Sequence, residues 1–225
     1  MDLTLLADWG MDLWLPALLV AVVAYFCGCF NGAVIVSKYI LRDDVRNHGS
    51  GNAGLTNFHR TFGGGLTFLV ILTDVIKAVV ALLFGAWAAR HFILDDTMVV
   101  VLAKYWAGLF CLLGHMFPCM FGFKGGKGIL SGGTIAIMVD WRVALVVWGG
   151  FIILVLLTRY VSLGSVWAGA SFPLATWFVF QNVLIFDLAL VCGILVVWKH
   201  RENIKRLLAG NENKFSLHKK KGETK

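Results

Sequence analysis

Residues Leu13 to Ser37 read LWLPALLVAVVAYFCGCFNGAVIVS, 25 residues without one Asp, Glu, Lys or Arg. A second uncharged stretch, Tyr160 to Phe186, holds 27 residues. About 20 consecutive apolar residues are enough for a helix to cross a bilayer. Each stretch is therefore long enough to span a membrane, and the pair predicts an all-α polytopic integral membrane protein.

The composition of the whole chain supports this fold class. Of the 225 residues, 59% are hydrophobic and 15% are charged, whereas soluble domains have roughly 45–50% and roughly 25%. These values exclude a disordered chain, a coiled coil and a nucleic-acid-binding arm, so we expect no nucleic-acid partner. The five cysteines form no C-x-x-C pair and lie in apolar surroundings. We expect them to be packing residues and predict no metal site.

Charge-poor runs along the chain predict about seven transmembrane helices. Their approximate limits are 13–37, 64–89, 98–117, 128–140, 143–158, 163–181 and 183–198. The fourth run is too short to cross a bilayer comfortably. The chain is expected to form one transmembrane domain over residues 1–215, followed by a basic tail over residues 216–225.

The distribution of Lys and Arg predicts the orientation in the membrane. With the N-terminus outside, sixteen of the 20 Lys and Arg residues fall in inner segments and only Arg90 and Arg142 fall in outer ones. The inner segments are 38–63, 117–128, 158–162 and 199–225. Cytoplasmic loops carry an excess of basic residues, so we predict an external N-terminus and a cytoplasmic C-terminus.

The first inner loop is rich in glycine and in hydrogen-bond donors. Its glycines permit backbone conformations that other residues resist, so their N–H groups can converge on an anion. A flexible turn between two helices is the alternative, but the density of donors and the arginines at both ends favour an anion site. The candidate residues of this loop are Gly49, Ser50, Gly51, Asn52, Thr56, Asn57 and Arg60.

The second inner loop, Gly114 to Gly128, reads GHMFPCMFGFKGGKG. Its glycines are one residue short of Walker A spacing and Gly128 follows the last lysine, so ATP binding by that route is unsupported. Two lysines among glycines predict a second anion site, and the preceding aromatic stretch suits a ligand with an apolar tail. A lysine-tipped surface loop and a core histidine are the alternatives. The candidates are His115, Lys124, Gly125, Gly126 and Lys127.

The third inner segment reads Lys199-His-Arg-Glu-Asn-Ile-Lys-Arg206. On a helix, His200 and Asn203 are three residues apart and share a face. By itself this pattern is typical of a basic helix that rests on anionic lipid. Because two other donor-rich loops accompany it, we also consider His200, Arg201 and Asn203 candidate site residues.

Three charged residues are predicted inside the membrane. Asp74 and Lys77 have helical i, i+3 spacing in the second span, and Lys104 lies in the third. A buried unpaired charge is costly in a bilayer, so Asp74 and Lys77 are expected to neutralise one another or to line a polar cavity. A structural ion pair and a direct part in catalysis are both open.

Taken together, the three loops resemble those of the bacterial acyl-phosphate:glycerol-3-phosphate acyltransferase family, PlsY. The resemblance runs from about Ala24 to Phe215. It rests on three motifs in the family's order, and it departs from the family's usual residues at Cys29, Asn31, Leu55, Ala78 and 129–131. The motifs are GSGNAGLTN at 49–57, GHMFP at 114–118 with FKGGKG at 123–128, and HRENIKR at 200–206.

The resemblance implies transfer of a fatty acyl group from acyl phosphate to the 1-hydroxyl of glycerol 3-phosphate, as the first acylation of phospholipid synthesis. The implied products are lysophosphatidic acid and inorganic phosphate. It also implies a seven-helix fold in the bacterial inner membrane with the site at the cytoplasmic face. The expected partners are acyl phosphate, glycerol 3-phosphate, membrane lipids and a soluble enzyme that produces acyl phosphate.

The residues fit this chemistry. Acyl phosphate is already an activated mixed anhydride, so no cofactor is expected. We expect residues 49–52, with Lys124 and Lys127, to bind phosphate, and Ser50, Arg60, His200 and Asn203 to be catalytic. Either His115 or His200 could accept the hydroxyl proton, and so could a substrate phosphate. A carrier for an organic phosphate is the competing hypothesis, although no inverted repeat is visible and the basic loops lie on one predicted side.

Overall fold

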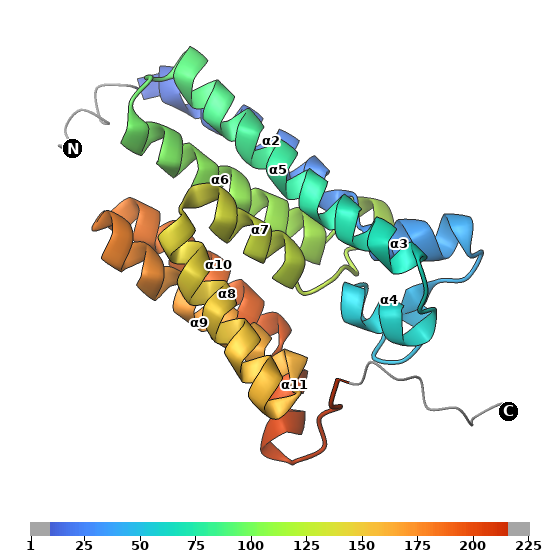
Figure 1. The fold of residues 1–225 in the computed structure, drawn as a ribbon. Coiled ribbons are helices and arrows are strands. Elements are labelled where there is room, and N and C mark those ends of the chain that lie inside the picture. Colours follow the sequence, from blue (N-terminus) through green and yellow to red (C-terminus); the bar gives the residue numbers. More distant parts are fainter. Residues whose placement is uncertain (1–9, 216–225) are drawn as a thin grey trace, which may run out of the picture.

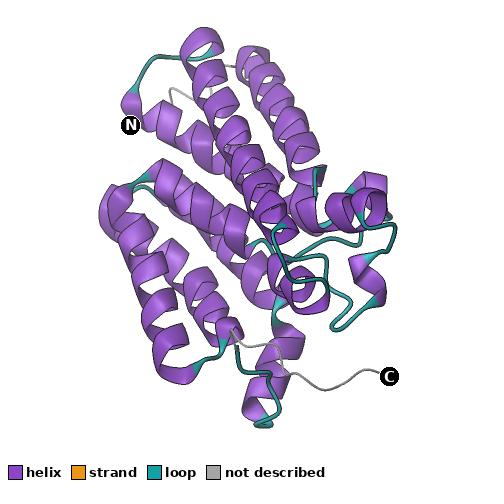
Figure 2. Ribbon diagram, turned by 45° about the vertical axis from the view of Figure 1, so that its right-hand side comes forward, coloured by secondary structure: helices purple, strands orange, loops and turns teal. Residues whose placement is uncertain are grey.

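The computed structural model describes residues 10–215, and all regular secondary structure in that range is helical (Figures 1 and 2). The predicted basic tail, residues 216–225, lies outside the described residues. The long helices are α2 (Gly10–Cys29), α5 (Leu66–Phe92), α6 (Thr97–Met116), α8 (Trp141–Thr158), α9 (Val161–Phe180) and α10 (Val183–Lys199). The shorter elements are α3 (Gly32–Ile35), η1 (Val36–Ile40), η2 (Val45–Asn47), α4 (Leu55–Thr61), η3 (Cys119–Phe121), α7 (Ile129–Val139) and α11 (Arg201–Leu208).

Each of the seven predicted runs overlaps one of the apolar helices α2 and α5 to α10. Five of them are long and apolar enough to cross a membrane, and α10 with α11, bent by 56° at His200, makes a sixth candidate. Helix α7 has 11 residues, so it is short, as its charge-poor run predicted. The all-α membrane fold is therefore confirmed, whereas the predicted orientation of the two termini stays a prediction.

The first predicted run is not one continuous helix. Helix α2 ends at Cys29, and the chain restarts as α3 after Asn31, which adopts an extended backbone conformation. The Asn31 side chain accepts a hydrogen bond from the N–H of Val34 at 3.1 Å and donates one to the carbonyl of Ala53 at 3.1 Å. Asparagine is a favoured N-cap, so this buried residue both starts α3 and attaches it to the first inner loop.

The helices form two groups, with α7 beside both. Helices α2, α5 and α6 pack on one another, and in the second group α8 and α10 both pack on α9 (Figure 1). The contact between α2 and α6 is close because glycines meet there. A Cβ atom at Gly28 would lie 2.1 Å from the carbonyl oxygen of Cys111, and one at Gly114 would lie 2.0 Å from that of Tyr25. Small residues allow this approach in membrane helices.

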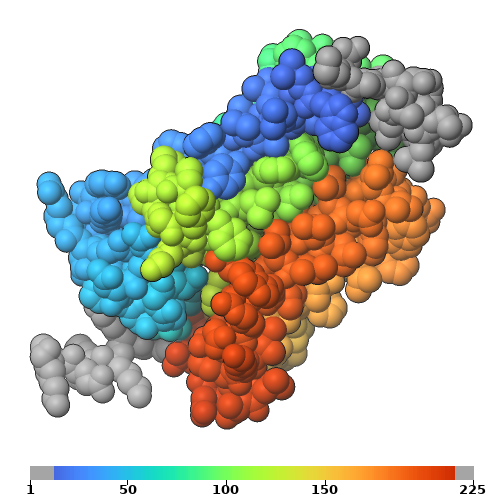
Figure 3. Space-filling view, turned by 180° about the vertical axis from the view of Figure 1, so that it is seen from behind, coloured from blue at the N-terminus to red at the C-terminus, as the bar shows by residue number. Residues whose placement is uncertain are grey.

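The donor-rich segments gather at one end of the bundle, around α3, α4 and α11 (Figure 1). Viewed from behind, the segment after α6 stands between the first inner loop and the C-terminal helix (Figure 3). Many large apolar side chains of the long helices are exposed, with Leu156, Leu157 and Phe178 among the most exposed. Such side chains suit a lipid environment, so the polar end is where soluble ligands can bind.

Candidate functional site

A cavity of about 620 Å³ lies at this polar end, and both helix groups contribute to its wall. Its lining comes from all three predicted loops and also from α5, α7, α8, α9 and the stretch after α11. Predicted residues in the wall are Gly49, Ser50, Asn52, Thr56, Asn57, Arg60, Asp74, His115, Lys127, His200 and Asn203. The predicted residues that do not line it are Gly51, Lys77, Lys104, Lys124, Gly125, Gly126 and Arg201.

Asn57 organises the first inner loop. Its buried side-chain amide donates to the carbonyls of Val45, His48 and Asn52 at 3.0–3.1 Å, and its oxygen accepts from the N–H of Ser50. The N–H of Gly51 also donates within the loop, to His48. Two of the N–H groups expected to converge on an anion are therefore bonded inside the loop, and Asn57 holds the loop's shape.

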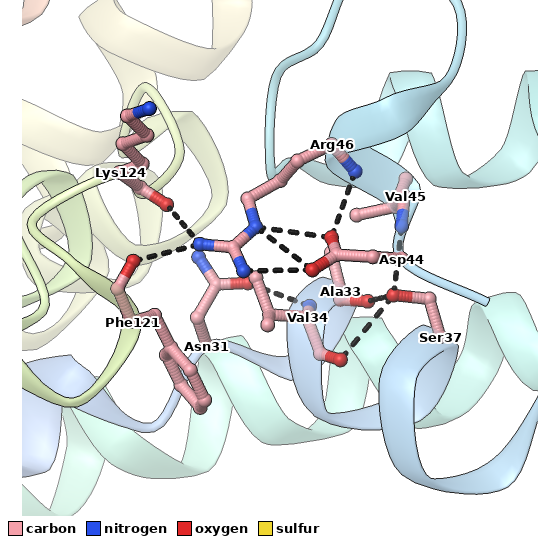
Figure 4. Close-up of polar contacts among 9 residues, drawn as sticks. All are labelled: Asn31, Ala33, Val34, Ser37, Asp44, Val45, Arg46, Phe121 and Lys124. Carbon is pink, nitrogen blue, oxygen red and sulfur yellow. Dashed lines mark hydrogen bonds and ion pairs between the residues drawn. The ribbon is translucent and has the colours of Figure 1, made fainter. Parts of the chain in front are cut away.

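Arg46 fixes the first loop to the second (Figure 4). Its guanidinium pairs with Asp44 at 2.7 Å and donates to the carbonyls of Phe121 at 2.7 Å and Lys124 at 3.4 Å. We call these four residues the Arg46 strut. The hydrogen bonds from Arg46 hold the pKa of Asp44 below its usual value. Arg46 is one of the arginines that flank the first loop, and its contacts connect that loop to the second one.

The two lysines of the second loop have different surroundings. Lys124 is exposed, and its carbonyl belongs to the Arg46 strut. Lys127 lines the cavity and donates to the side-chain oxygen of Asn203 on α11. Burial lowers the pKa of Lys127 to about 8, because removing an ammonium from water disfavours its charged form.

Glycines allow the second loop to press against the end of α6. The N–H groups of Gly125 and Gly126 donate to the carbonyls of Met116 and His115 at 3.3 and 3.1 Å. A Cβ atom at Gly126 would lie 2.2 Å from Nε2 of His115. These glycines therefore bring Lys127 and His115 to the same wall, without themselves lining the cavity.

His200 and Asn203 lie in the same wall of the cavity, as their spacing predicted. The Nδ1–H of His200 donates to the carbonyl of Val196 at 2.8 Å, which leaves Nε2 as the nitrogen that can accept a proton. Arg201 is directed elsewhere. Its guanidinium lies 4.5 Å from the ring centre of Trp198, and the side chain is exposed.

Asp74 and Lys77 form the expected ion pair inside the membrane, at 2.6 Å. The Lys77 ammonium also donates to Nδ1 of His115 at 2.7 Å and to the carbonyl of Phe30 at 3.2 Å. Since an ammonium can only donate, Nδ1 of His115 is an acceptor and its proton is on Nε2. Lys104 is separate from this network and donates to the carbonyl of Met138.

Some residues of the wall were missed by the sequence analysis. Two features of the sequence could have indicated them: an acidic residue within a basic segment, and two serines at the start of an otherwise apolar span. They are Ser162, Ser165, Arg206 and Glu212, with the apolar Ile129, Leu130, Trp148, Phe151 and Phe215. Among the described residues, the Ser162 hydroxyl is the one buried side-chain polar atom without a hydrogen-bond partner. No cluster of His, Cys, Asp or Glu within residues 10–215 could hold a metal ion.

The cavity thus joins cationic and hydrogen-bonding groups to an apolar wall. Arg60, Lys127 and Arg206 can neutralise a phosphate, and the aromatic and aliphatic side chains can hold a hydrocarbon tail. His200 offers a proton acceptor beside them. This arrangement suits a reaction between phosphorylated molecules, one of which is a lipid.

Comparisons with known proteins point the same way. Residues 18–210 match the model of a family described as glycerol-3-phosphate acyltransferase. A protein of that name from Clostridioides difficile is 39% identical over 202 residues, which cover 90% of this chain and 97% of that protein. Another, from Thermoanaerobacter pseudethanolicus, is 37% identical over 199 residues, which cover 88% of this chain and 96% of that protein. A crystal structure of PlsY, an integral membrane glycerol 3-phosphate acyltransferase in its glycerol 3-phosphate form, is 35% identical, with a TM-score of 0.77 over 89% of this chain and 96% of that one.

Proposed function

The chain belongs to the glycerol-3-phosphate acyltransferase family, and from this premise we propose that it uses acyl phosphate as the acyl donor. The proposed reaction acylates the 1-hydroxyl of sn-glycerol 3-phosphate and yields lysophosphatidic acid and inorganic phosphate. The observation that carries this proposal is the cavity wall, where Lys127, Arg60 and Arg206 lie with apolar side chains at the polar end of the bundle.

The bond changes of the proposed step are simple. The hydroxyl oxygen of glycerol 3-phosphate attacks the acyl carbonyl carbon, and the bond from that carbon to the phosphate oxygen breaks. Phosphate is the leaving group, so no covalent enzyme intermediate and no cofactor are required. Catalysis then consists of positioning two anionic substrates and stabilising negative charge on the carbonyl and the departing phosphate.

We assign the phosphate contacts to Ser50, Arg60 and Lys127, and the polarisation of the carbonyl to Asn203. Each of these side chains lines the cavity. For the hydroxyl proton, the hydrogen bonds favour His200 over His115. Nδ1 of His115 accepts from Lys77, so its Nε2 carries the proton, whereas Nε2 of His200 has a lone pair. A substrate phosphate is the other possible acceptor.

The proposed setting follows from the charge distribution. Sixteen of the 20 Lys and Arg residues lie in the segments assigned to the inside, which supports a bacterial inner-membrane enzyme with its site at the cytoplasmic face. An acyl phosphate made by a soluble enzyme would then reach the cavity from the cytoplasm or from the inner leaflet.

The test is phosphate release by the purified protein in detergent, given palmitoyl phosphate with and without glycerol 3-phosphate. We expect release to require both substrates and to equal the lysophosphatidic acid formed. Palmitoyl coenzyme A in place of palmitoyl phosphate is the matched control for the donor, and we expect no product from it. Product from the coenzyme A ester alone would overturn the proposed donor. Uptake of glycerol 3-phosphate into sealed vesicles without acylation would support the carrier hypothesis instead.

A further inference from the structure

Glu212 is an acid in the wall of a cavity that is suited to anions. It belongs to the segment after α11, residues 209–215, and its side chain is 8% exposed. A carboxylate in that position would repel a phosphate unless neighbouring donors neutralise it.

Two side chains of α11 donate to Glu212. The Nδ2 of Asn203 donates to Oε1 at 2.8 Å, and Nε of Arg206 donates to Oε2 at 2.7 Å. Asn203 in turn accepts from Lys127 through its side-chain oxygen. We call Lys127, Asn203, Glu212 and Arg206 the cation wall.

These contacts fix how two side chains face the cavity. A carboxylate only accepts and an ammonium only donates, so the Asn203 amide can have one orientation. Glu212 binds one amide hydrogen of Asn203 and only the Nε of Arg206. Among residues 10–215, the second amide hydrogen and the two terminal nitrogens of the Arg206 guanidinium have no further partner and remain for a ligand.

The backbone holds Glu212 from both sides. At the end of α11, the N–H of Gly210 donates to Leu207 and that of Asn211 to Arg206, and Gly210 has φ +70°. This is the Schellman arrangement, which ends a helix in a fixed geometry. Further on, the N–H of Phe215 donates to the carbonyl of Arg159, between α8 and α9, at 2.7 Å. The segment therefore joins α11 to the α8–α9 turn.

Glu212 is suited to remain ionised in this position. Its partial burial would raise the pKa of its carboxyl, but the hydrogen bonds from Asn203 and Arg206 outweigh burial and lower that pKa. An ionised carboxylate with two donors is a stronger hydrogen-bond acceptor than a neutral group.

We propose that Glu212 is a positioning residue of the active site, which orients the Asn203 amide and the Arg206 guanidinium toward a phosphorylated substrate. Arg206 then becomes a further phosphate-binding residue. This inference rests on the proposed function for the identity of the substrate. It predicts that removal of the acid weakens a site for anions, which is opposite to the effect of removing a simple repulsive charge.

The first experiment compares Glu212→Ala and Glu212→Gln with Glu202→Ala. Glu202 is an exposed acid of α11, and it pairs with Lys205 at 3.2 Å. Its substitution changes the net charge equally without touching the cavity. For Glu212→Ala we expect kcat/KM for glycerol 3-phosphate to fall about 10–100-fold, by analogy with outer-shell residues that orient metal ligands. Glu212→Gln keeps one acceptor oxygen, so its kcat/KM should fall less. The kcat/KM of Glu202→Ala should stay within about twofold of the wild-type value.

The second experiment separates positioning from general stability. Binding of glycerol 3-phosphate is measured by calorimetry for Arg206→Ala, Glu212→Gln and the double variant, with melting temperatures in the same detergent. If Glu212 acts partly through Arg206, the double variant loses less binding than the sum of the two single losses, because the contribution through Arg206 is already absent in Arg206→Ala. Additive losses with a lowered melting temperature would overturn the proposal, as would wild-type or tighter binding by Glu212→Gln.

These results are distinguishable from failure of the proposed function. If the wild-type protein binds glycerol 3-phosphate but transfers no acyl group from palmitoyl phosphate, the proposed donor is wrong. The binding comparison among the variants still decides the role of Glu212 in that case.

Discussion

The Arg46 strut and the cation wall are both hydrogen-bond networks built on basic side chains, but they differ in whether those side chains also face the cavity. In the strut, the Arg46 guanidinium donates to one carboxylate and two backbone carbonyls, all within the protein. In the cation wall, Lys127 and Arg206 have protein partners and also line the cavity. A basic residue near a glycine loop therefore has a binding role only if some of its donors face the cavity.

The two lysines of the second loop give the sharpest test of this difference. We expect Lys127→Ala to lower turnover about 10²–10³-fold, since it removes a preorganised cationic donor from the cavity. Lys124→Ala should stay within about threefold, because the exposed side chain of Lys124 is not part of the wall. Phosphate release from palmitoyl phosphate and glycerol 3-phosphate measures both. Equal losses in the two variants would contradict the distinction drawn between them.

A large effect on stability is expected inside the membrane. Lys77→Met leaves Asp74 buried without its ammonium partner, and breaking a buried ion pair costs about 3–5 kcal/mol. The melting temperature in detergent should fall markedly. The double variant Asp74→Asn/Lys77→Met should recover part of the loss, because no unpaired charge remains. A single variant as stable as the wild type would show that Asp74 is neutralised in another way.

Substitutions of the arginines at the two ends of the first loop should have different effects. Arg60 lines the cavity, so Arg60→Ala should weaken glycerol 3-phosphate binding about 10–100-fold, the loss expected for a hydrogen bond to a charged group. Arg46→Ala should mainly lower the melting temperature, by loosening the tie between the loops. Calorimetric binding and thermal unfolding of both variants check this. A binding defect in Arg46→Ala at unchanged melting temperature would assign Arg46 to the site.

Much of this arrangement could be predicted from the sequence, and the reason the rest could not is physical. Hydrophobic runs predicted the seven apolar helices because burial in lipid depends on local composition. The spacing of His200 and Asn203 predicted that they share a wall because one helical turn fixes both. The connection that Arg46 makes between the loops could not be predicted, since Arg46 donates to carbonyls some 75 residues away in the chain. Glu212 was missed for a different reason: its partners Asn203 and Arg206 are close in sequence, but the contact depends on how the chain turns after α11 ends.

The activity should depend on pH through Lys127. Its pKa is lowered to about 8 by burial, so its ammonium loses its proton as the pH rises through that value, and the binding of a phosphate weakens. We expect kcat/KM to fall above about pH 8. Bound phosphate stabilises the ammonium, so kcat should fall only at higher pH. Lys127→Arg keeps its charge throughout this range. Its profile should stay flat where that of the wild type falls, whereas parallel profiles would assign the loss to another group.

The smallest effect is expected at Lys104, which extends the comparison to a lysine far from the cavity. Its ammonium makes one hydrogen bond, to the carbonyl of Met138, and has no carboxylate partner among residues 10–215. Lys104→Met keeps the length of the side chain and removes both the hydrogen bond and the cost of burying a charge. These contributions oppose one another, so the melting temperature should change by only a few degrees and turnover should stay within about twofold. A loss of activity at an unchanged melting temperature would mean that Lys104 affects the site without contacting it. A basic residue could then have a functional role even though none of its donors faces the cavity.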